Sequence, residues 1–280
     1  VYDPATSYVS RVSILKKPVF WGIWLAFYIN ITCGLALISQ EKDILHDVLK
    51  AFPQYAPLSP SAFAAAISGI IGLVLAVDSV FNTAGRVGFS TLSDHLKRRE
   101  TVYQVIFVIS IAVCLLQVCT NSIDRALLWA VLMMLFLVNA GYGGGFSTVP
   151  AYLADLFGTQ MVGAIHGRLL TAWAAAGVLG PVLVNYLREY QLSIGVERAA
   201  AYDITLYILA GLLVLGFICN LLVRPVADKY FMTDAELAAE QALGHDKGAD
   251  ASTSLEWKAA PGSRPLVIAA WLAVGIPLLW

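Results

Sequence analysis

Three polar residues in one apolar stretch are spaced so that they could bind a charged molecule. Asp78, Asn82 and Arg86 recur every four residues in "LVLAVDSVFNTAGRVGF", and in a helix this spacing places them along one side. Arginine stays protonated under all relevant conditions, and a charge at the centre of a bilayer costs about 3 kcal/mol on insertion scales. Arg86 therefore requires an anion. The candidates are Asp78, an acid outside this sequence, or a substrate carboxylate bound by two parallel hydrogen bonds.

Two roles are open for Asp78. An acid inside the membrane can carry a proton together with a substrate, or it can be the permanent partner of Arg86. His166 and Arg168 fall near the start of a later apolar segment, where we expect contacts of a gate rather than of a binding site.

The composition identifies a membrane protein. Of the 280 residues, 59% are hydrophobic and 13% are charged, whereas soluble domains carry about 25% charged residues. The net charge of −1 argues against nucleic acid as a partner. The cysteines lie in apolar segments without CxxC spacing or clustered histidines, so we interpret them as small buried side chains and expect no metal or other cofactor. They are Cys33, Cys114, Cys119 and Cys219.

Six apolar segments are long enough to cross a bilayer, which takes about 20 residues in a helix. They cover residues 18–39, 61–87, 101–120, 126–150, 163–187 and 202–223. A further apolar segment, 265–280, is about a turn short of a full span. We expect the polar stretch 224–264 to be a linker in which "TDAE" at 233–236 opens a short helix. Residues 1–17 lack a signal-peptide pattern and are interpreted as the remnant of a central cytoplasmic loop.

Basic residues near the segment ends indicate the orientation in the membrane. If the first segment enters from the cytoplasm, the run "KRR" at 97–99 is cytoplasmic. The third and sixth segments are aliphatic nearly all round, whereas the other four carry the polar side chains, which lipid cannot satisfy. Four helices therefore line an interior and two face lipid. This period of three predicts two three-helix repeats, as in many secondary transporters.

The glycines of "NAGYGGGFSTVPAYLADLFG", residues 139–158, do not form a nucleotide loop. The stretch contains no lysine for a Walker motif, and Phe146 stands where the dinucleotide fingerprint needs its last glycine. Gly141 and Gly145 instead form a GxxxG face, which lets helix backbones approach closely, and Pro150 permits a kink. We interpret the stretch as a tightly packed pore helix. Similar packing is expected for Gly163, Gly167, Gly177 and Gly180.

The stretch "STLSDHLKRR" at 90–99 resembles the cytoplasmic loop signature of the major facilitator superfamily. Asp94, Arg98 and Arg99 match the signature, and Ser90 and Lys97 replace its two glycines. In that superfamily the aspartate caps a neighbouring helix and pairs with basic residues, which latches the outward-facing state. The signature occurs once in each half. The resemblance therefore implies an all-α membrane protein, the six-helix C-terminal half of a major facilitator bundle plus a short C-terminal hydrophobic segment.

Within the superfamily, three stretches resemble the oxalate:formate antiporter family of bacterial anion exchangers. They are "FNTAGRVGFSTLSD", the glycine-rich stretch above and "GAIHGRLLTAWAAAGVLGPVL". In the oxalate exchangers, basic residues on the eighth and eleventh helices hold the two substrate carboxylates, and aromatic side chains close the cage. Arg86 matches the eighth-helix position, but Trp173 stands where the oxalate exchanger has lysine. One cation fits a monocarboxylate such as formate, lactate or pyruvate better than a dianion, unless the other half supplies a second.

The same resemblance nominates further contacts to the substrate. The candidate walls are Tyr28, Tyr142 and Trp173, and the candidate polar contacts are Asn82 and Asn139. Taken alone, each aromatic residue is better explained by ordinary packing inside the bundle.

These observations predict a secondary transporter of small organic anions that works by alternating access in a bacterial inner membrane. The mode is exchange of oxalate- and formate-type anions or symport with a proton. The expected partners are a small carboxylate, a proton, the lipid bilayer and an N-terminal six-helix half. A non-transporting sensor or scaffold subunit is the alternative. A membrane enzyme is disfavoured because the four histidines lie in separate loops or helix ends and no nucleophile has a base nearby.

Overall fold

The computed structural model describes residues 13–96, 98–120, 125–159, 162–198, 200–224, 235 and 238. A short 3-10 helix, η1 (Ser13–Lys16), precedes six α-helices. They are α1 (Pro18–Ala51), α2 (Pro60–His95), α3 (Glu100–Cys119), α4 (Arg125–Phe157), α5 (Val162–Ser193) and α6 (Asp203–Leu222). The described residues contain no strand. The expected apolar segment 265–280 and, except for Ala235, the expected capping box at 233–236 lie outside the described residues.

All six α-helices are long and apolar enough to cross a membrane, which confirms the predicted all-α membrane protein. Several helices extend beyond the predicted spans. The first span was expected to end at residue 39, but α1 continues to Ala51 and still buries Ile44, Leu45 and Asp47. The prediction was too short because an apolar window measures the thickness of the bilayer, whereas a helix continues wherever one face remains buried.

The helix ends follow from local signals in the sequence. Pro60 begins α2, and the Oγ of Ser59 accepts the backbone N–H of Ala62 at 3.4 Å. Gly158 after α4 and Gly195 after α5 have φ of 84° and 86°, a left-handed conformation that favours glycine at helix C-termini.

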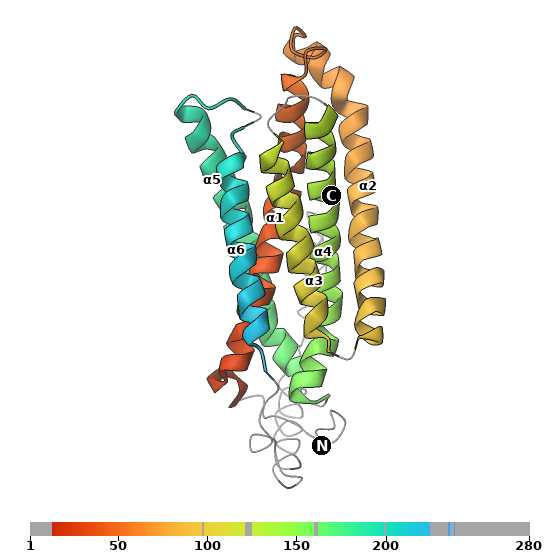
Figure 1. Cartoon of the computed structure of the whole chain (residues 1–280), viewed down its shortest axis with the longest axis vertical. Helices are drawn as coiled ribbons and strands as arrows, with labels where there is room; N and C mark the ends of the chain where they lie inside the picture. Colours follow the sequence, from red (N-terminus) through yellow and green to blue (C-terminus); the bar gives the residue numbers. More distant parts are fainter. Residues whose placement is uncertain are drawn as a thin grey trace, which may run out of the picture. The chain divides into compact units, whose positions relative to one another are not determined.

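The packing of the six helices repeats after every third helix. α2 packs against α4, and α5 packs in the same way against α1; likewise α3 contacts α4 as α6 contacts α1. The pairs α1–α4 and α3–α6 are also in contact, and the smaller contacts α1–α2 and α2–α3 have their counterparts in α4–α5 and α5–α6. Exchanging α1–α3 for α4–α6 therefore reproduces the contacts, which is the arrangement that two three-helix repeats predict (Figure 1).

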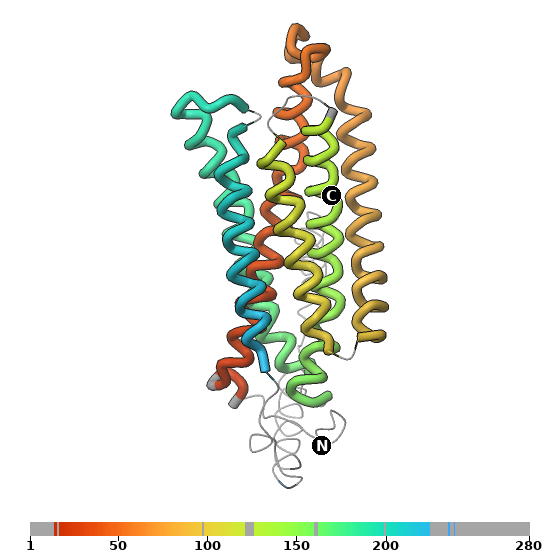
Figure 2. Tube along the Cα trace, in the orientation of Figure 1, coloured from red at the N-terminus to blue at the C-terminus, as the bar shows by residue number. Residues whose placement is uncertain are grey.

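α2 and α5 are the two least buried helices, and they lie at opposite edges of the six-helix group in Figure 2. α2 exposes Leu73, Val80 and Val87, and α5 exposes Val178 and Val182. The polar residues Asp78, Asn82 and Arg86 of α2 lie instead where α2 meets α4.

Candidate functional site

Four polar side chains of α2 and α4 form a continuous hydrogen-bonded chain. Arg86 Nε donates to Asn82 Oδ1 at 3.0 Å, and Asn82 Nδ2 donates to Asn139 Oδ1 at 2.7 Å. Asn139 Nδ2 in turn donates to Asp78 Oδ2. Asp78 is 4% and Asn139 5% exposed. Each amide turns its carbonyl toward the cation and its NH₂ toward the carboxylate, so the hydrogen bonds polarise one another.

Arg86 keeps free hydrogen-bonding capacity at its tip. Among the residues that the structure describes, Arg86 forms no direct ion pair with Asp78, and its two terminal nitrogens have no partner. The guanidinium carbon lies 5.4 Å from the ring centroid of Phe146. The two terminal N–H groups therefore present the fork that binds a carboxylate bidentately.

Glycines allow α2 and α4 to approach closely enough for this hydrogen-bonded chain. A Cβ on Gly85 would overlap the backbone carbonyl of Ala140, and a Cβ on Gly143 would overlap that of Asn82. The glycine-rich stretch is therefore tightly packed, but the close approach of a backbone is at Gly143; the predicted pair Gly141 and Gly145 meets side chains of α3 and α1 instead. The expectation for α5 is only partly met: Gly180 would meet the Thr32 carbonyl at 2.8 Å, whereas Gly163 and Gly167 have nothing within 4 Å. These two glycines lack a close neighbour because they lie on the exposed side of α5.

The predicted aromatic walls fall into two groups. Tyr142 fills the space over Gly34 of α1, where a Cβ would lie 2.6 Å from its ring, and Trp173 Nε1 donates to the Tyr142 hydroxyl at 3.3 Å. Tyr28 stacks on Trp24 with centroids 5.1 Å apart, and Trp24 Nε1 donates to Thr171 Oγ1 at 2.9 Å. Tyr142 lies three residues after Asn139 on α4, so the first group is one helical turn from the hydrogen-bonded chain.

Sequence reasoning missed Phe146 and Trp24 as aromatic neighbours of these groups. The signal for each was its helical spacing of four: Phe146 follows Tyr142 on α4, and Trp24 precedes Tyr28 on α1.

The three residues of the predicted gate loop, Asp94, Arg98 and Arg99, do not form a single cluster of ion pairs. Arg99 donates from Nε to Asp155 Oδ2 at 2.8 Å and from Nη1 to Asp94 Oδ1 at 2.9 Å, which ties the α2–α3 turn to the end of α4. Burial opposes the charged form of Arg99, but the two carboxylates outweigh it and raise the pKa of the guanidinium. Arg98 instead pairs with Glu100 at 2.5 Å. Sequence reasoning missed Asp155, the one acid in the last two turns of α4.

The gate contacts expected for His166 and Arg168 are not seen among the described residues. His166 Nδ1 is buried without a hydrogen-bond partner, and Arg168 Nη1 donates to the Ala164 carbonyl of its own helix at 3.3 Å.

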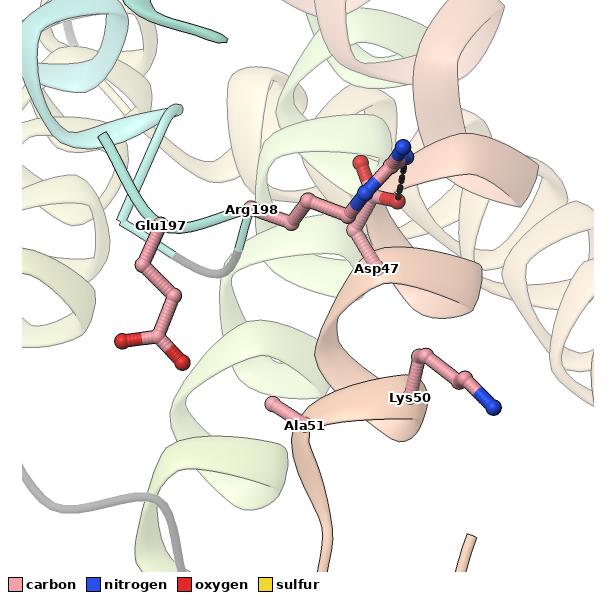
Figure 3. A pocket seen from close by; sticks show the side chains of 5 residues that line it. All are labelled: Asp47, Lys50, Ala51, Glu197 and Arg198. Carbon is pink, nitrogen blue, oxygen red and sulfur yellow. Dashed lines mark hydrogen bonds and ion pairs between the residues drawn. The ribbon is translucent and has the colours of Figure 1, made fainter. Parts of the chain in front are cut away.

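A second charged cluster joins α1 to α5 at the end of the bundle that holds the α5–α6 connection. Asp47, 1% exposed, accepts from Arg188 Nη2 at 2.6 Å, from the Tyr202 hydroxyl at 3.2 Å and from Arg198 Nη1 at 3.5 Å. Asp47 and Arg198 line a cavity of about 180 Å³ together with Lys50, Ala51 and Glu197, and Figure 3 shows how these five side chains lie. Burial and the charge of Asp47 raise the pKa of Tyr202, so its hydroxyl keeps the proton that it donates. The charge of Asp47 is already compensated by Arg188 and Arg198. We therefore interpret the cluster as a contact that holds α1 and α5 together.

The described residues contain no group of three or more His, Cys, Asp or Glu side chains that could hold a metal ion. The polar groups of the site that the structure describes are the charged ends of the hydrogen-bonded chain and the two amides between them.

Comparisons with known proteins agree with this architecture. The sequence profile of the Major Facilitator Superfamily matches residues 4–181 and 55–279. An oxalate:formate antiporter of Oxalobacter formigenes is 25% identical over 167 residues, which is 60% of this chain and 35% of that protein. The glucose transporter GlcP of Staphylococcus epidermidis (strain ATCC 12228 / FDA PCI 1200) is 27% identical over 164 residues, which is 58% of this chain and 33% of that protein.

The chain thus spans about a third of the length of these curated relatives. Both relatives are named as transporters, and their names give different substrates. Together with six helices that can cross a membrane, the profile match identifies the chain as a multi-pass membrane protein that belongs to the Major Facilitator Superfamily.

Proposed function

We propose that the chain is part of a secondary transporter of small organic anions, in which Arg86 anchors a substrate carboxylate. The observation that carries the proposal is the state of the Arg86 side chain. Its Nε is fixed by Asn82, while its terminal nitrogens have no partner among the described residues and the guanidinium stands beside Phe146. A fork that is held at its base and free at its tip is prepared for bidentate binding.

The charge of Arg86 favours an anion over a sugar. A carboxylate would satisfy the terminal nitrogens of Arg86 with two charge-assisted hydrogen bonds, whereas a neutral sugar hydroxyl offers them only weaker, uncharged acceptors. Similarity to the oxalate:formate antiporter supports this substrate class, whereas similarity to the glucose transporter supports a sugar. Glucose is therefore the second candidate, and stacked aromatic rings such as Trp24 and Tyr28 are its supporting feature.

Within the anions, a monocarboxylate fits this chain better than oxalate. Trp173 occupies the position of the expected second cation, and its indole N–H is bonded to Tyr142. One guanidinium balances one carboxylate, so formate, lactate or pyruvate is the proposed class, with exchange or proton symport as the mode. The proposed location is a bacterial inner membrane.

An N-terminal six-helix half is the proposed partner of the outward faces of α2 and α5. The chain spans about a third of its relatives, and small residues line the open face of α2, where Gly69, Gly72 and Gly88 have nothing within 4 Å of a Cβ. Such a face suits close packing of another helix in lipid. Residues 1–17 would then connect the halves, and residues 224–264 would be a linker to the segment 265–280.

Counterflow in proteoliposomes tests the proposed substrate class. Vesicles that contain the complete transporter are loaded in turn with unlabelled formate, pyruvate, oxalate or glucose, and the entry of the labelled compound is measured. The proposal expects transient accumulation of a labelled carboxylate and none of glucose. Counterflow of glucose without that of any carboxylate would establish the sugar alternative, and no counterflow of either would favour a sensor or scaffold subunit.

A further inference from the structure

Two clusters of charged and polar side chains lie at opposite ends of the six-helix group. The Asp47 cluster consists of Asp47, Arg188, Arg198 and Tyr202. The Arg99 cluster consists of Ser93, Asp94, Arg99 and Asp155. Figure 1 shows the α5–α6 connection, which carries part of the Asp47 cluster, at one end of the helices, and the α2–α3 connection, which carries part of the Arg99 cluster, at the other.

The close contacts of two glycines set the correspondence between the two three-helix repeats. Exchanging α1–α3 for α4–α6 replaces α1 by α4 and α5 by α2. A Cβ on Gly180 of α5 would lie 2.8 Å from the carbonyl oxygen of Thr32 on α1, and a Cβ on Gly85 of α2 would overlap the carbonyl oxygen of Ala140 on α4. Gly180 therefore corresponds to Gly85, and Thr32 corresponds to Ala140.

The acids of the two clusters occupy the same position in this correspondence. Asp155 follows Ala140 by as many residues as Asp47 follows Thr32. Both stretches are continuous α-helix, so equal spacing in the sequence is equal spacing along the helix. The two acids are therefore equivalent, although they lie at opposite ends of the bundle, because α1 and α4 finish at opposite ends (Figure 1).

The residue immediately before the third helix donates to the acid in both clusters. Tyr202 precedes α6, and its hydroxyl donates to Asp47 at 3.2 Å. Arg99 precedes α3, and its Nε donates to Asp155 at 2.8 Å. Each cluster therefore joins the first helix of one repeat to the start of the third helix of the other.

The second helices contribute from matching positions, but with different residues. Arg188 follows Gly180 by as many residues as Ser93 follows Gly85. Arg188 forms the shortest ion pair of its cluster, at 2.6 Å, whereas Ser93 only accepts a hydrogen bond from Arg99 at 2.9 Å. The main cation thus lies on the second helix in one cluster and before the third helix in the other. The correspondence is therefore visible in the contacts but not as a repeated motif.

We propose that the Asp47 cluster is the symmetry-related counterpart of the Arg99 cluster, and that the two bias alternating access in opposite directions. Exchange of inverted repeats also exchanges the two sides of the membrane, so the state open at one end becomes the state open at the other. Equivalent clusters then favour opposite states. Each cluster joins three helices at its own end of the bundle and opposes opening at that end. This inference rests on the proposed transport by alternating access, but not on which substrate is carried.

Cysteine labelling at the two ends of α2 tests the proposal without any substrate. Ala65→Cys and Thr91→Cys are reporters on exposed positions of α2, near the ends that hold the Asp47 and Arg99 clusters respectively. Each is placed in the complete transporter in a background without other reactive cysteines, and its rate of reaction with a polar maleimide is measured in detergent. Arg188→Gln should raise the ratio of the Ala65→Cys rate to the Thr91→Cys rate, and Arg99→Gln should lower it, each by about fivefold or more.

The burial of the two acids predicts which variant has the larger effect. The side chain of Asp47 is 1% exposed, whereas that of Asp155 is 44% exposed. Loss of a partner matters more for a buried charge than for an exposed one, so the ratio should change more in Arg188→Gln than in Arg99→Gln. Tyr202→Phe removes only a hydroxyl and keeps the ring, so it should raise the ratio by a smaller factor and serves as the test if Arg188→Gln does not fold.

The double variant distinguishes a bias between states from a purely structural role. Arg188→Gln combined with Arg99→Gln should return the ratio toward the wild-type value, although it melts at a lower temperature than either single variant. Asp43→Asn, at an exposed acid one turn before Asp47, should leave the ratio unchanged. Shifts of the ratio in the same direction in Arg188→Gln and Arg99→Gln, or an unchanged ratio in both Arg188→Gln and Tyr202→Phe, would overturn the proposal.

Counterflow of labelled carboxylate separates this inference from the proposed function. If the ratio shifts in opposite directions but no carboxylate is transported, the proposed substrate class is wrong and the paired clusters stand. If carboxylate counterflow occurs and the ratio shifts in the same direction in both variants, the paired clusters are wrong and the anion transporter stands.

Discussion

The side-chain amide of Asn82 on α2 donates a 2.7 Å hydrogen bond to the amide oxygen of Asn139 on α4. Through this contact the charges of Arg86 and Asp78 are linked without touching, and α2 is attached to α4 at the level of the proposed site. Because Arg86 and Asp78 both lie on α2, a movement of α4 relative to α2 would withdraw Asn139 and break the link between the two charges.

Replacement of Asn139 measures how much the hydrogen bonds between α2 and α4 contribute to the free energy of unfolding. Asn139→Ala leaves Asp78 buried without any partner and should lower the free energy of unfolding by about 1–3 kcal/mol. Asn82→Ala should cost less, because Asn82 is only half-buried. Chemical denaturation in detergent measures both variants and the double variant. The link predicts non-additive losses, with a coupling of about 0.5–3 kcal/mol, whereas strictly additive losses would show that the two amides act independently.

Two glycines of α2 form a matched pair for the helix packing. Gly85→Ala places a Cβ against the Ala140 carbonyl and should destabilise the protein by about 1–3 kcal/mol, as overpacking does. Gly88→Ala meets nothing within 4 Å and should be neutral or stabilising by up to about 1 kcal/mol in this chain, because alanine favours the helix. Thermal unfolding of the purified chain compares them, and equal melting temperatures would contradict the packing seen between α2 and α4.

Much of the fold was predictable because the bilayer restricts it. Apolar windows located all six helices, and the polar residues on every helix but the third of each group indicated the repeat. Helix ends were less predictable. α1 continues past residue 39 through Glu41 and Asp47, because a helix with one buried face and many polar residues has too low a mean hydropathy to be recognised as part of a span.

The site was predictable only along a single helix. The spacing of Asp78, Asn82 and Arg86 indicated a shared side, but the position of Asn139 between them depends on the register of α4 against α2, which the glycines set. The partnership of Asp47 with Arg188 joins residues 141 positions apart, and no periodicity in the sequence contains that information.

Arg99 and Arg98 should differ in their effect on transport. Arg99→Gln removes the ion pairs with Asp94 and Asp155 that connect the α2–α3 turn to α4. It should therefore lower the rate at which the transporter alternates between its inward- and outward-facing states. Arg98→Gln removes only the pair with Glu100, two residues further along, in which the arginine is largely exposed. It should behave close to wild type, because ion pairs at the surface contribute about 0–1 kcal/mol. Initial rates of counterflow compare the variants. A larger loss in Arg98→Gln than in Arg99→Gln would rule out this division of roles.

Trp173→Lys should shift selectivity toward dianions. The lysine would place a second cation beside Tyr142, which now accepts the indole N–H, so two carboxylates would find two basic partners. A monocarboxylate would leave the new charge unmatched, at a cost of several kcal/mol for a buried ion. Competition of oxalate and formate for the same site measures the shift, after melting curves have shown that the variant is folded. Tighter binding of oxalate than of formate or pyruvate by the wild type would instead place a second cation outside this chain.

The anchor role of Arg86 is tested most directly by equilibrium binding of a labelled monocarboxylate to the complete transporter and to Arg86→Lys. Lysine retains the charge but cannot keep the bond to Asn82 while presenting two parallel donors. Lys42→Gln removes an exposed positive charge elsewhere and serves as the control. We predict a loss of affinity of about tenfold to a hundredfold for Arg86→Lys, equivalent to one charged hydrogen bond, with unchanged melting temperature and a control that binds like the wild type. Wild-type affinity in Arg86→Lys would contradict the account.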